Sequence, residues 1–257
     1  MPKVVSKDGT KIAYDRQGSG PAMILVLGAL NKRGSGKKLG HALANDFTVV
    51  SYDRRGRGDS GDTQPYVIES EIDDLEALID EVGGKVQLYG HSSGGVLALL
   101  ATQQLGEKVG GLAVYEIPYN SDPAAQPAAE QYRRNLRGLL AEDRRSEAVE
   151  SFVKSVGVTD KQVEAMRRIP LWNSLTAMAP TLEYDTVELM ERYPAIDPKN
   201  IMVPTLVMYG GSSPDFMADT AIQLSGAIPG ATLLALEGQT HDVRPDAIAP
   251  ALVAGLK

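Results

Sequence analysis

The chain of 257 residues contains no cysteine. This absence excludes disulfide bonds, thiolate catalysis, zinc fingers and cysteine-ligated iron–sulfur clusters, and it suits a reducing compartment. At this length the core of a single domain buries about 70–75% of the unfolded surface, so that stability needs neither a cross-link nor a structural metal. We therefore expect one large domain, or one domain with a sizeable insertion.

Positive charge and long apolar runs are also scarce. The 26 Lys and Arg residues against 33 Asp and Glu give a formal net charge of −7, which disfavours a nucleic-acid partner because such binding needs a basic surface. The short basic run at residues 54–57 is expected to be solvated surface. The longest apolar run, residues 22–30, is far shorter than the roughly 20 residues of a membrane-spanning helix. Residues 1–8 lack the apolar segment of a secretory signal.

From these absences we expect a cytoplasmic protein whose partner is a small-molecule substrate, with no nucleic-acid or membrane partner, as a monomer or a homodimer. No cofactor or metal is expected either. Residues 56–61 fit the glycine spacing of a dinucleotide fingerprint, but the turn residues 62–65 follow where an apolar helix is needed. Residues 34–38 fail as a phosphate-binding loop because Lys38 replaces the Ser or Thr that would hold magnesium.

Strands and helices alternate in residues 1–117 and 199–257. Short, nearly continuous apolar runs are typical of strands that are buried on both faces, and Asp8-Gly9 suits the turn of a β-hairpin. Strands are expected at residues 4–6, 11–15, 22–27, 47–52, 85–89, 111–115, 205–209 and 232–236. The alternation predicts an α/β fold, with a mostly parallel twisted sheet of about eight strands and helices on both faces.

Residues 118–198 differ from the rest of the chain because they contain no convincing strand. Helical patterns are found there at residues 128–140, 146–156, 161–168 and 182–192. The sheet pattern resumes afterwards, so the two halves of the core, 1–117 and 199–257, must meet. We expect residues 118–198 to form a helical lid over one edge of the sheet.

The sequence Gly-His-Ser-Ser-Gly at residues 90–94 lies between an apolar strand and a helix that is apolar on every side. A sharp strand-to-helix turn strains the backbone at Ser92 and leaves no room for a Cβ atom at Gly90 or Gly94. Such a turn exposes the Ser92 hydroxyl at the carboxyl end of the sheet, beside a helix N-terminus that favours negative charge. We predict that Ser92 is a nucleophile, against the alternative of a purely structural turn.

A serine nucleophile needs a general base, and the chain has three histidines. His91 neighbours Ser92 in the strained turn and is expected to have a packing role. His41 lies in a helical stretch ahead of the nucleophile. His241 follows the last predicted strand, on a loop at the carboxyl edge of the sheet, and we predict that it is the base.

These features resemble the α/β-hydrolase superfamily, in its serine-nucleophile branch with a helical cap. Residues 53–60 resemble the family's D-x-R-G-x-G-x-S loop after the fourth strand, and residues 27–29 stand where the family has His-Gly-x. The resemblance implies an oxyanion hole formed by the backbone N–H groups of Ala29 and Ser93. Leu27 replaces the usual His, which leaves the backbone donor intact. The lid matches the position of the family's cap domain.

The acid of the triad departs from the family's pattern. The family's acid follows the seventh strand in a turn like G-x-x-D-P, but residues 210–214 read Gly-Gly-Ser-Ser-Pro, with Ser213 in the acid's place. A serine cannot balance an imidazolium charge, so the acid has moved or the triad is incomplete. The candidates are Asp215, two residues late, and Glu116, which ends the sixth strand as the acid does in haloalkane dehalogenases. We favour Glu116, with a helix N-cap or a lid salt bridge as its alternative role.

The resemblance implies acyl transfer to water, and we expect a small or medium, mainly apolar ester or lactone as the substrate. The lid and the segment before it contain Trp172, Met178 and Tyr119, which either line an apolar pocket or pack the helices onto each other. Three rival functions stay open: carbon–carbon bond hydrolysis or perhydrolysis on the same triad, a lyase reaction, and ligand binding without catalysis.

Overall fold

The strands in the described part of the chain form one sheet of eight. The computed structural model describes residues 2–257, with side chains for all of these except 187, 188 and 195. Across the sheet the order is β1-β2-β4-β3-β5-β6-β7-β8. The strands are β1 (Lys3–Val5), β2 (Lys11–Gly18), β3 (Ala22–Val26), β4 (Thr48–Tyr52), β5 (Val86–His91), β6 (Val109–Tyr115), β7 (Thr205–Gly210) and β8 (Thr232–Leu236).

The sheet is antiparallel at one edge and parallel elsewhere. β1 and β2 pair as an antiparallel hairpin, and the turn between them contains Gly9 with φ 87°. β2 pairs antiparallel with β4, and every pair from β4 to β8 is parallel. This arrangement confirms the mostly parallel sheet expected from the apolar runs.

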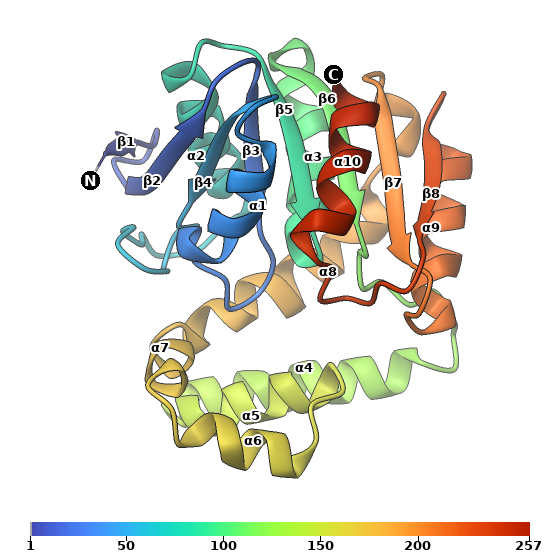
Figure 1. Ribbon diagram of the computed structural model, residues 1–257. Coiled ribbons are helices and arrows are strands. Elements are labelled where there is room, and N and C mark those ends of the chain that lie inside the picture. The colour runs from blue at the N-terminus through green and yellow to red at the C-terminus, as the bar shows by residue number, and fades with distance from the viewer. Residues whose placement is uncertain (1) are drawn as a thin grey trace.

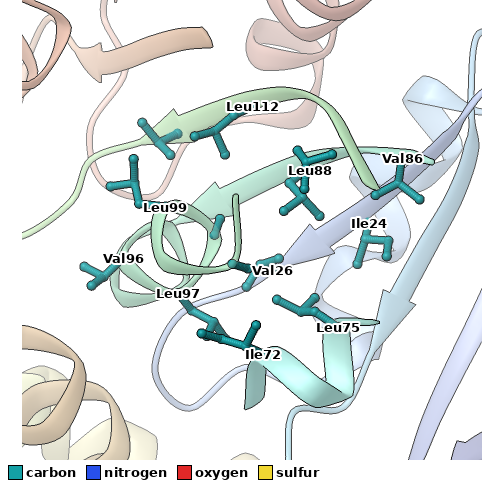
Figure 2. Packing of buried hydrophobic residues seen from close by; sticks show 14 of the residues in the cluster. Ile24, Val26, Ile72, Leu75, Val86, Leu88, Val96, Leu97, Leu99 and Leu112 are labelled. Atoms are coloured by element: carbon teal, nitrogen blue, oxygen red, sulfur yellow. The ribbon is translucent and has the colours of Figure 1, made fainter. Parts of the chain in front are cut away.

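Helices cover both faces of the sheet (Figure 1). One face packs against α2 (Ile68–Glu81), α3 (Ser93–Leu105) and α9 (Asp215–Ala227), and the other against α1 (Lys37–Leu43) and α10 (Pro245–Leu256). Because successive side chains of a strand point to opposite faces, Ile24 joins the first core and Leu25 the second. Figure 2 shows Ile24 and Leu88 of the strands packed with Leu75 of α2 and Leu97 of α3.

The segment between β6 and β7 is helical, as expected, and we call residues 118–198 the helical insertion. Its helices are α4 (Gln126–Ala141), α5 (Arg145–Ser155), α6 (Asp160–Arg167), α7 (Leu171–Ala177) and α8 (Leu189–Arg192). α4–α7 build an apolar cluster of their own, against which Ala29 and Leu30 of the loop after β3 pack, whereas Leu189 of α8 belongs to the core on one face of the sheet. The helices α4–α7 lie beyond the strand ends at one edge of the sheet (Figure 1).

Two details of the helical insertion differ from the expectation. α7 was not predicted, and its short length of seven residues gives a weak periodic signal. The continuous helix expected at residues 182–192 is divided into a π-helical turn at Tyr184–Glu188 and the short α8. A π-turn and an α-helix carry similar sequence patterns, so the division depends on what the turn contacts. No helix in residues 2–257 is long and apolar enough to cross a membrane.

Candidate active site

Ser92 occupies a strained turn between β5 and α3. Its φ of 57° and ψ of −133° lie outside the regions that residues other than glycine usually adopt. A Cβ on Gly90 would lie 2.6 Å from the Cα of Gly95, and a Cβ on Gly94 would collide with the carbonyl oxygen of Val26. The turn therefore has the predicted geometry, and it requires glycine at both positions.

The loop after β3 lies directly against Ser92. A Cβ on Gly28 would lie 2.8 Å from the Cβ and 3.3 Å from the Oγ of Ser92. Ala29 is the next residue of this loop, and Ser93 is the first residue of α3. Among the backbone hydrogen bonds of residues 2–257 that lie outside regular helices and strands, none has the amide of Ala29 or Ser93 as its donor. These are the two N–H groups that the resemblance implied as oxyanion donors, and that role stays a prediction.

Glu116 follows β6 and is 2% exposed. Its Oε1 accepts a hydrogen bond from the Gly210 amide at 2.8 Å, and its Oε2 lies 2.9 Å from Nδ1 of His241. Burial alone would raise the pKa of the Glu116 carboxyl, but His241, the nearby Ser213 hydroxyl and the Gly210 amide together outweigh burial and hold the pKa below its ordinary value. The carboxyl group is therefore an anion that is held on both oxygens.

His241 lies on the loop after β8, with 38% of its side chain exposed. Glu116 accepts the hydrogen of Nδ1, which leaves the lone pair on Nε2. In the described chain, the side chain of His241 forms a hydrogen bond with Glu116, and the backbone carbonyl of His241 accepts a hydrogen bond from His91. Neither of these hydrogen bonds involves Ser92. The rings of His91 and His241 are 4.9 Å apart, so the base candidate lies beside the residue that precedes Ser92. A bond between base and nucleophile is often long before substrate binds.

His91 and Tyr115 hold the His241 loop in place. His91 donates from Nε2 to the carbonyl oxygen of His241 at 3.0 Å, and the Tyr115 hydroxyl donates to the carbonyl oxygen of Thr240 at 2.6 Å. Burial of its ring, with a smaller contribution from His241, lowers the pKa of His91 to about 3. His91 therefore stays uncharged, in agreement with the packing role predicted for it. The role of Tyr115 was missed, because its position at the end of an apolar strand carries no signal.

Among the described residues, the other candidates for base and acid form no hydrogen bond or ion pair with the side chain of His241. His41 is exposed on α1, and Asp215 is exposed at the first turn of α9. Ser213, at the position where the family's pattern has its acid, lies near the Glu116 carboxyl. Of the candidates weighed from the sequence, the structure brings Glu116 to His241.

The residues predicted to bind substrate have contacts typical of packing. Trp172 and Met178 are 6% and 4% exposed and belong to the apolar cluster of the helical insertion. Trp172 donates from Nε1 to the Ser146 hydroxyl at 3.0 Å. The ring of Tyr119 packs against that of Tyr193 in a tilted arrangement, with 4.3 Å between the ring centroids. These contacts favour the packing alternative for all three residues.

The prediction that residues 54–57 are solvated surface is wrong. Arg54, Arg55 and Arg57 are at most 2% exposed, because each forms ion pairs with buried carboxylates. Two of those carboxylates, Glu71 and Asp74, lie on the core-facing side of α2. Acidic residues at core-facing positions were the available signal, since a buried charge needs a partner.

Comparisons with known proteins agree with this architecture. The model of a family described as "Alpha/beta hydrolase family" matches residues 32–253. The crystal structure of an alpha/beta hydrolase from Sphaerobacter thermophilus is 47% identical, covers the whole of both chains and superposes with a TM-score of 0.90.

Curated relatives match over shorter stretches. An uncharacterized hydrolase, YraK, from Bacillus subtilis is 36% identical over 95 residues, which are 35% of each chain. The lipase LipV from Mycobacterium tuberculosis is 28% identical over 127 residues, which are 48% of this chain and 45% of the lipase. The chain thus matches less than half the length of these two curated relatives.

Proposed function

Because the chain belongs to the alpha/beta hydrolase family, we propose that it is a serine hydrolase with Ser92 as nucleophile, His241 as general base and Glu116 as the acid that orients the base. The observation that carries this proposal is the 2.9 Å contact between Oε2 of Glu116 and Nδ1 of His241. It supplies the carboxylate that the turn at residues 210–214 lacks, at the same edge of the sheet as Ser92.

The proposed reaction has two halves. Nε2 of His241 takes the proton of Ser92 Oγ while that oxygen attacks the acyl carbon, and the carbonyl oxygen becomes an oxyanion. The intermediate expels the alcohol, which takes the proton from His241 and leaves an acyl group on Ser92. Water then gives a proton to His241 and attacks the acyl carbon, and Ser92 regains its proton as the carboxylic acid leaves.

Charge development in this reaction matches the electrostatics of the site. The imidazolium of His241 forms next to the Glu116 carboxylate, whose pKa is lowered and which is therefore ionised. The oxyanion forms where the amides of Ala29 and Ser93 and the N-terminus of α3 favour negative charge. Removing one such donor typically costs about 2.7–4 kcal/mol of transition-state stabilisation.

The proposed substrate is a small or medium, mainly apolar ester or lactone. Ala29 and Leu30, which follow Gly28 beside Ser92, pack against the apolar cluster of the helical insertion. A substrate whose carbonyl reaches the Ala29 amide would therefore meet apolar side chains of the insertion, which acts as a lid in this proposal. The partial match to a lipase is consistent with an ester substrate.

A fluorophosphonate probe and p-nitrophenyl esters test the proposal. The purified protein is expected to hydrolyse p-nitrophenyl acetate or butyrate and to be labelled at Ser92. Ser92→Ala and His241→Ala are expected to lose both activities, whereas His41→Ala, a substitution on the exposed face of α1, keeps them. Equal labelling of the wild type and His241→Ala would refute an acyl-enzyme that depends on this base.

A further inference from the structure

The carbonyl group that precedes the Ala29 amide is held by a buried arginine. Nη1 of Arg57 donates to the carbonyl oxygen of Gly28 at 2.7 Å. The Gly28–Ala29 peptide unit is planar, and in a trans unit the C=O and N–H bonds point in opposite directions. Fixing the carbonyl oxygen of Gly28 on Arg57 therefore fixes the direction of the Ala29 N–H as well.

Asp185, on the π-helical turn of the helical insertion, connects this arginine to the nucleophile turn. Its Oδ2 accepts from Nη2 of Arg57 at 2.5 Å, and its Oδ1 accepts from the Ser93 hydroxyl at 2.8 Å. Oδ1 also accepts from Nη1 of Arg54 at 2.6 Å, and the same Nη1 lies 3.3 Å from the carbonyl oxygen of Leu27. The Asp185 carboxylate thus contacts Arg57, which holds the Gly28–Ala29 peptide unit, and it also contacts the side chain of Ser93.

We infer that Asp185 and Arg57 are positioning residues that orient the Ala29 and Ser93 amides, so that the helical insertion sets the geometry of the oxyanion hole. This inference rests on the proposed function, because an oxyanion hole matters only if Ser92 attacks a carbonyl. Neither side chain acts on the substrate. Arg57 acts through the Gly28–Ala29 peptide group, and Asp185 acts through Arg57 and the Ser93 hydroxyl.

The charge state of Asp185 fits this role. The carboxyl group is fully buried, which alone would raise its pKa, but Arg54 and Arg57 outweigh burial and hold the pKa below its ordinary value. An ionised carboxylate accepts hydrogen bonds on both oxygens and donates none. It can therefore hold the two arginines and the Ser93 hydroxyl at the same time.

A neighbouring buried ion pair of the same loop has no contact with the residues of the proposed oxyanion hole. Arg55 forms a bidentate pair with Asp74, at 2.8 and 2.7 Å, and both side chains are at most 1% exposed. The further contacts of Arg55 are to Asp8 and to the carbonyl oxygen of Ser70, remote from the oxyanion loop. Arg55 stands at the Arg of the D-x-R-G-x-G-x-S pattern, whereas Arg54 and Arg57 stand at its variable positions.

Kinetics of Arg57→Met test the inference, because methionine fills similar space without a donor. With p-nitrophenyl butyrate, kcat is expected to fall about 10- to 100-fold while KM changes less than about 3-fold, since the oxyanion exists only after attack. Binding of phenylboronic acid, which forms a tetrahedral adduct with an activated serine, should weaken by a similar factor. Arg57→Lys keeps one charged donor and should recover part of kcat.

Asp185→Asn and Asp74→Asn form a matched pair, since each breaks a buried ion pair of the same loop. Both variants are expected to lower the melting temperature. Only Asp185→Asn should lower kcat per fluorophosphonate-reactive site and the affinity for phenylboronic acid.

Two outcomes would overturn the inference in distinguishable ways. If Arg57→Met and Asp185→Asn lose stability like Asp74→Asn but keep the wild-type kcat and phenylboronic acid affinity, the inference is wrong and the proposed function stands. If the wild type neither reacts with the fluorophosphonate nor hydrolyses the ester, the proposed function fails and the inference fails with it.

Discussion

Glu116 and His241 are in contact although 125 positions separate them in the chain, with Oε2 of the first 2.9 Å from Nδ1 of the second. The contact comes from the order of the strands. β6 lies between β5, which ends at the nucleophile turn, and β7, so a carboxylate after β6 emerges beside Ser92. The amide of Gly210, at the end of β7, donates a hydrogen bond to Glu116. The family's pattern places its acid in the turn that follows this strand.

Glu116→Gln is expected to lower kcat by about 10³- to 10⁴-fold. The amide side chain keeps the size of glutamate, but it neither balances the imidazolium charge nor enforces the required tautomer of His241. Steady-state hydrolysis of p-nitrophenyl butyrate measures the loss, with Asp215→Asn as the matched control on the exposed N-terminus of α9. A large loss in Asp215→Asn together with a harmless Glu116→Gln would reverse the assignment of the acid.

Moving the carboxylate back to position 213 is expected to restore part of the activity that Glu116→Gln loses. The Ser213 hydroxyl is close enough to help lower the pKa of Glu116, so an aspartate there would reach the same charged region. In the double variant Glu116→Gln/Ser213→Asp we expect kcat to recover about 10-fold or more over Glu116→Gln, on the scale by which the triad acid contributes.

The single variant Ser213→Asp is the control for this rescue. With Glu116 still present, two carboxylates would share one buried site, and one of them would be protonated or pushed away. We expect a lower melting temperature for Ser213→Asp than for the wild type. A double variant no more active than Glu116→Gln would show that position 213 cannot serve His241.

The fold could be predicted from the sequence because its signals are local. The continuous apolar run that became β3 and the Asp8-Gly9 turn each depend on a few adjacent residues. The nucleophile turn is local in part: Gly90 is required by contacts with Gly95 and Ala98 just after the turn, whereas Gly94 is required by the backbone of Val26 and Leu27 at the end of β3.

The site could be predicted only in part, because its remaining contacts join distant segments. Whether Glu116 or Asp215 serves His241 depends on the register of β6 and β7 at their carboxyl ends, which periodicity does not encode. Arg57 and Asp185 are 128 positions apart. The sequence around each shows a charged residue in a polar stretch, so the basic run was assigned to the surface. Both are buried because the helical insertion brings Asp185 onto the loop that contains Arg57.

Gly28→Ala is expected to lower kcat about 10- to 100-fold, as small displacements at a reacting centre do. The new Cβ would lie 2.8 Å from the Cβ of Ser92, so the loop and the nucleophile must move apart. Gly34→Ala is the matched control on the next turn of the chain, since a Cβ there meets nothing within 4 Å. Ester hydrolysis and phenylboronic acid binding measure the effect. Wild-type kinetics in Gly28→Ala would mean that the loop does not contact Ser92 during the reaction.

The free energy of unfolding is expected to depend on pH in part through the titration of His91. Its pKa is lowered from 6.5 to about 3, because burial of the ring disfavours the charged form. Between those two pH values the unfolded chain binds more protons at this residue than the folded protein does. The free energy of unfolding contributed by His91 is therefore full above pH 6.5 and decreases as the pH falls towards about 3, by up to about 1.4 kcal/mol per pH unit.

His91→Gln removes this titration and is expected to flatten the decrease. Urea unfolding at pH 4, 5, 6 and 7 measures the slope for the wild type and the variant, and His41→Gln, on the exposed face of α1, controls for the loss of a histidine. Glutamine also keeps a donor that can reach the carbonyl oxygen of His241, so the contact that holds the catalytic loop can survive. Parallel curves for the wild type and His91→Gln would show that His91 accepts a proton in the folded protein, and its ring would then be charged beside His241 in acid.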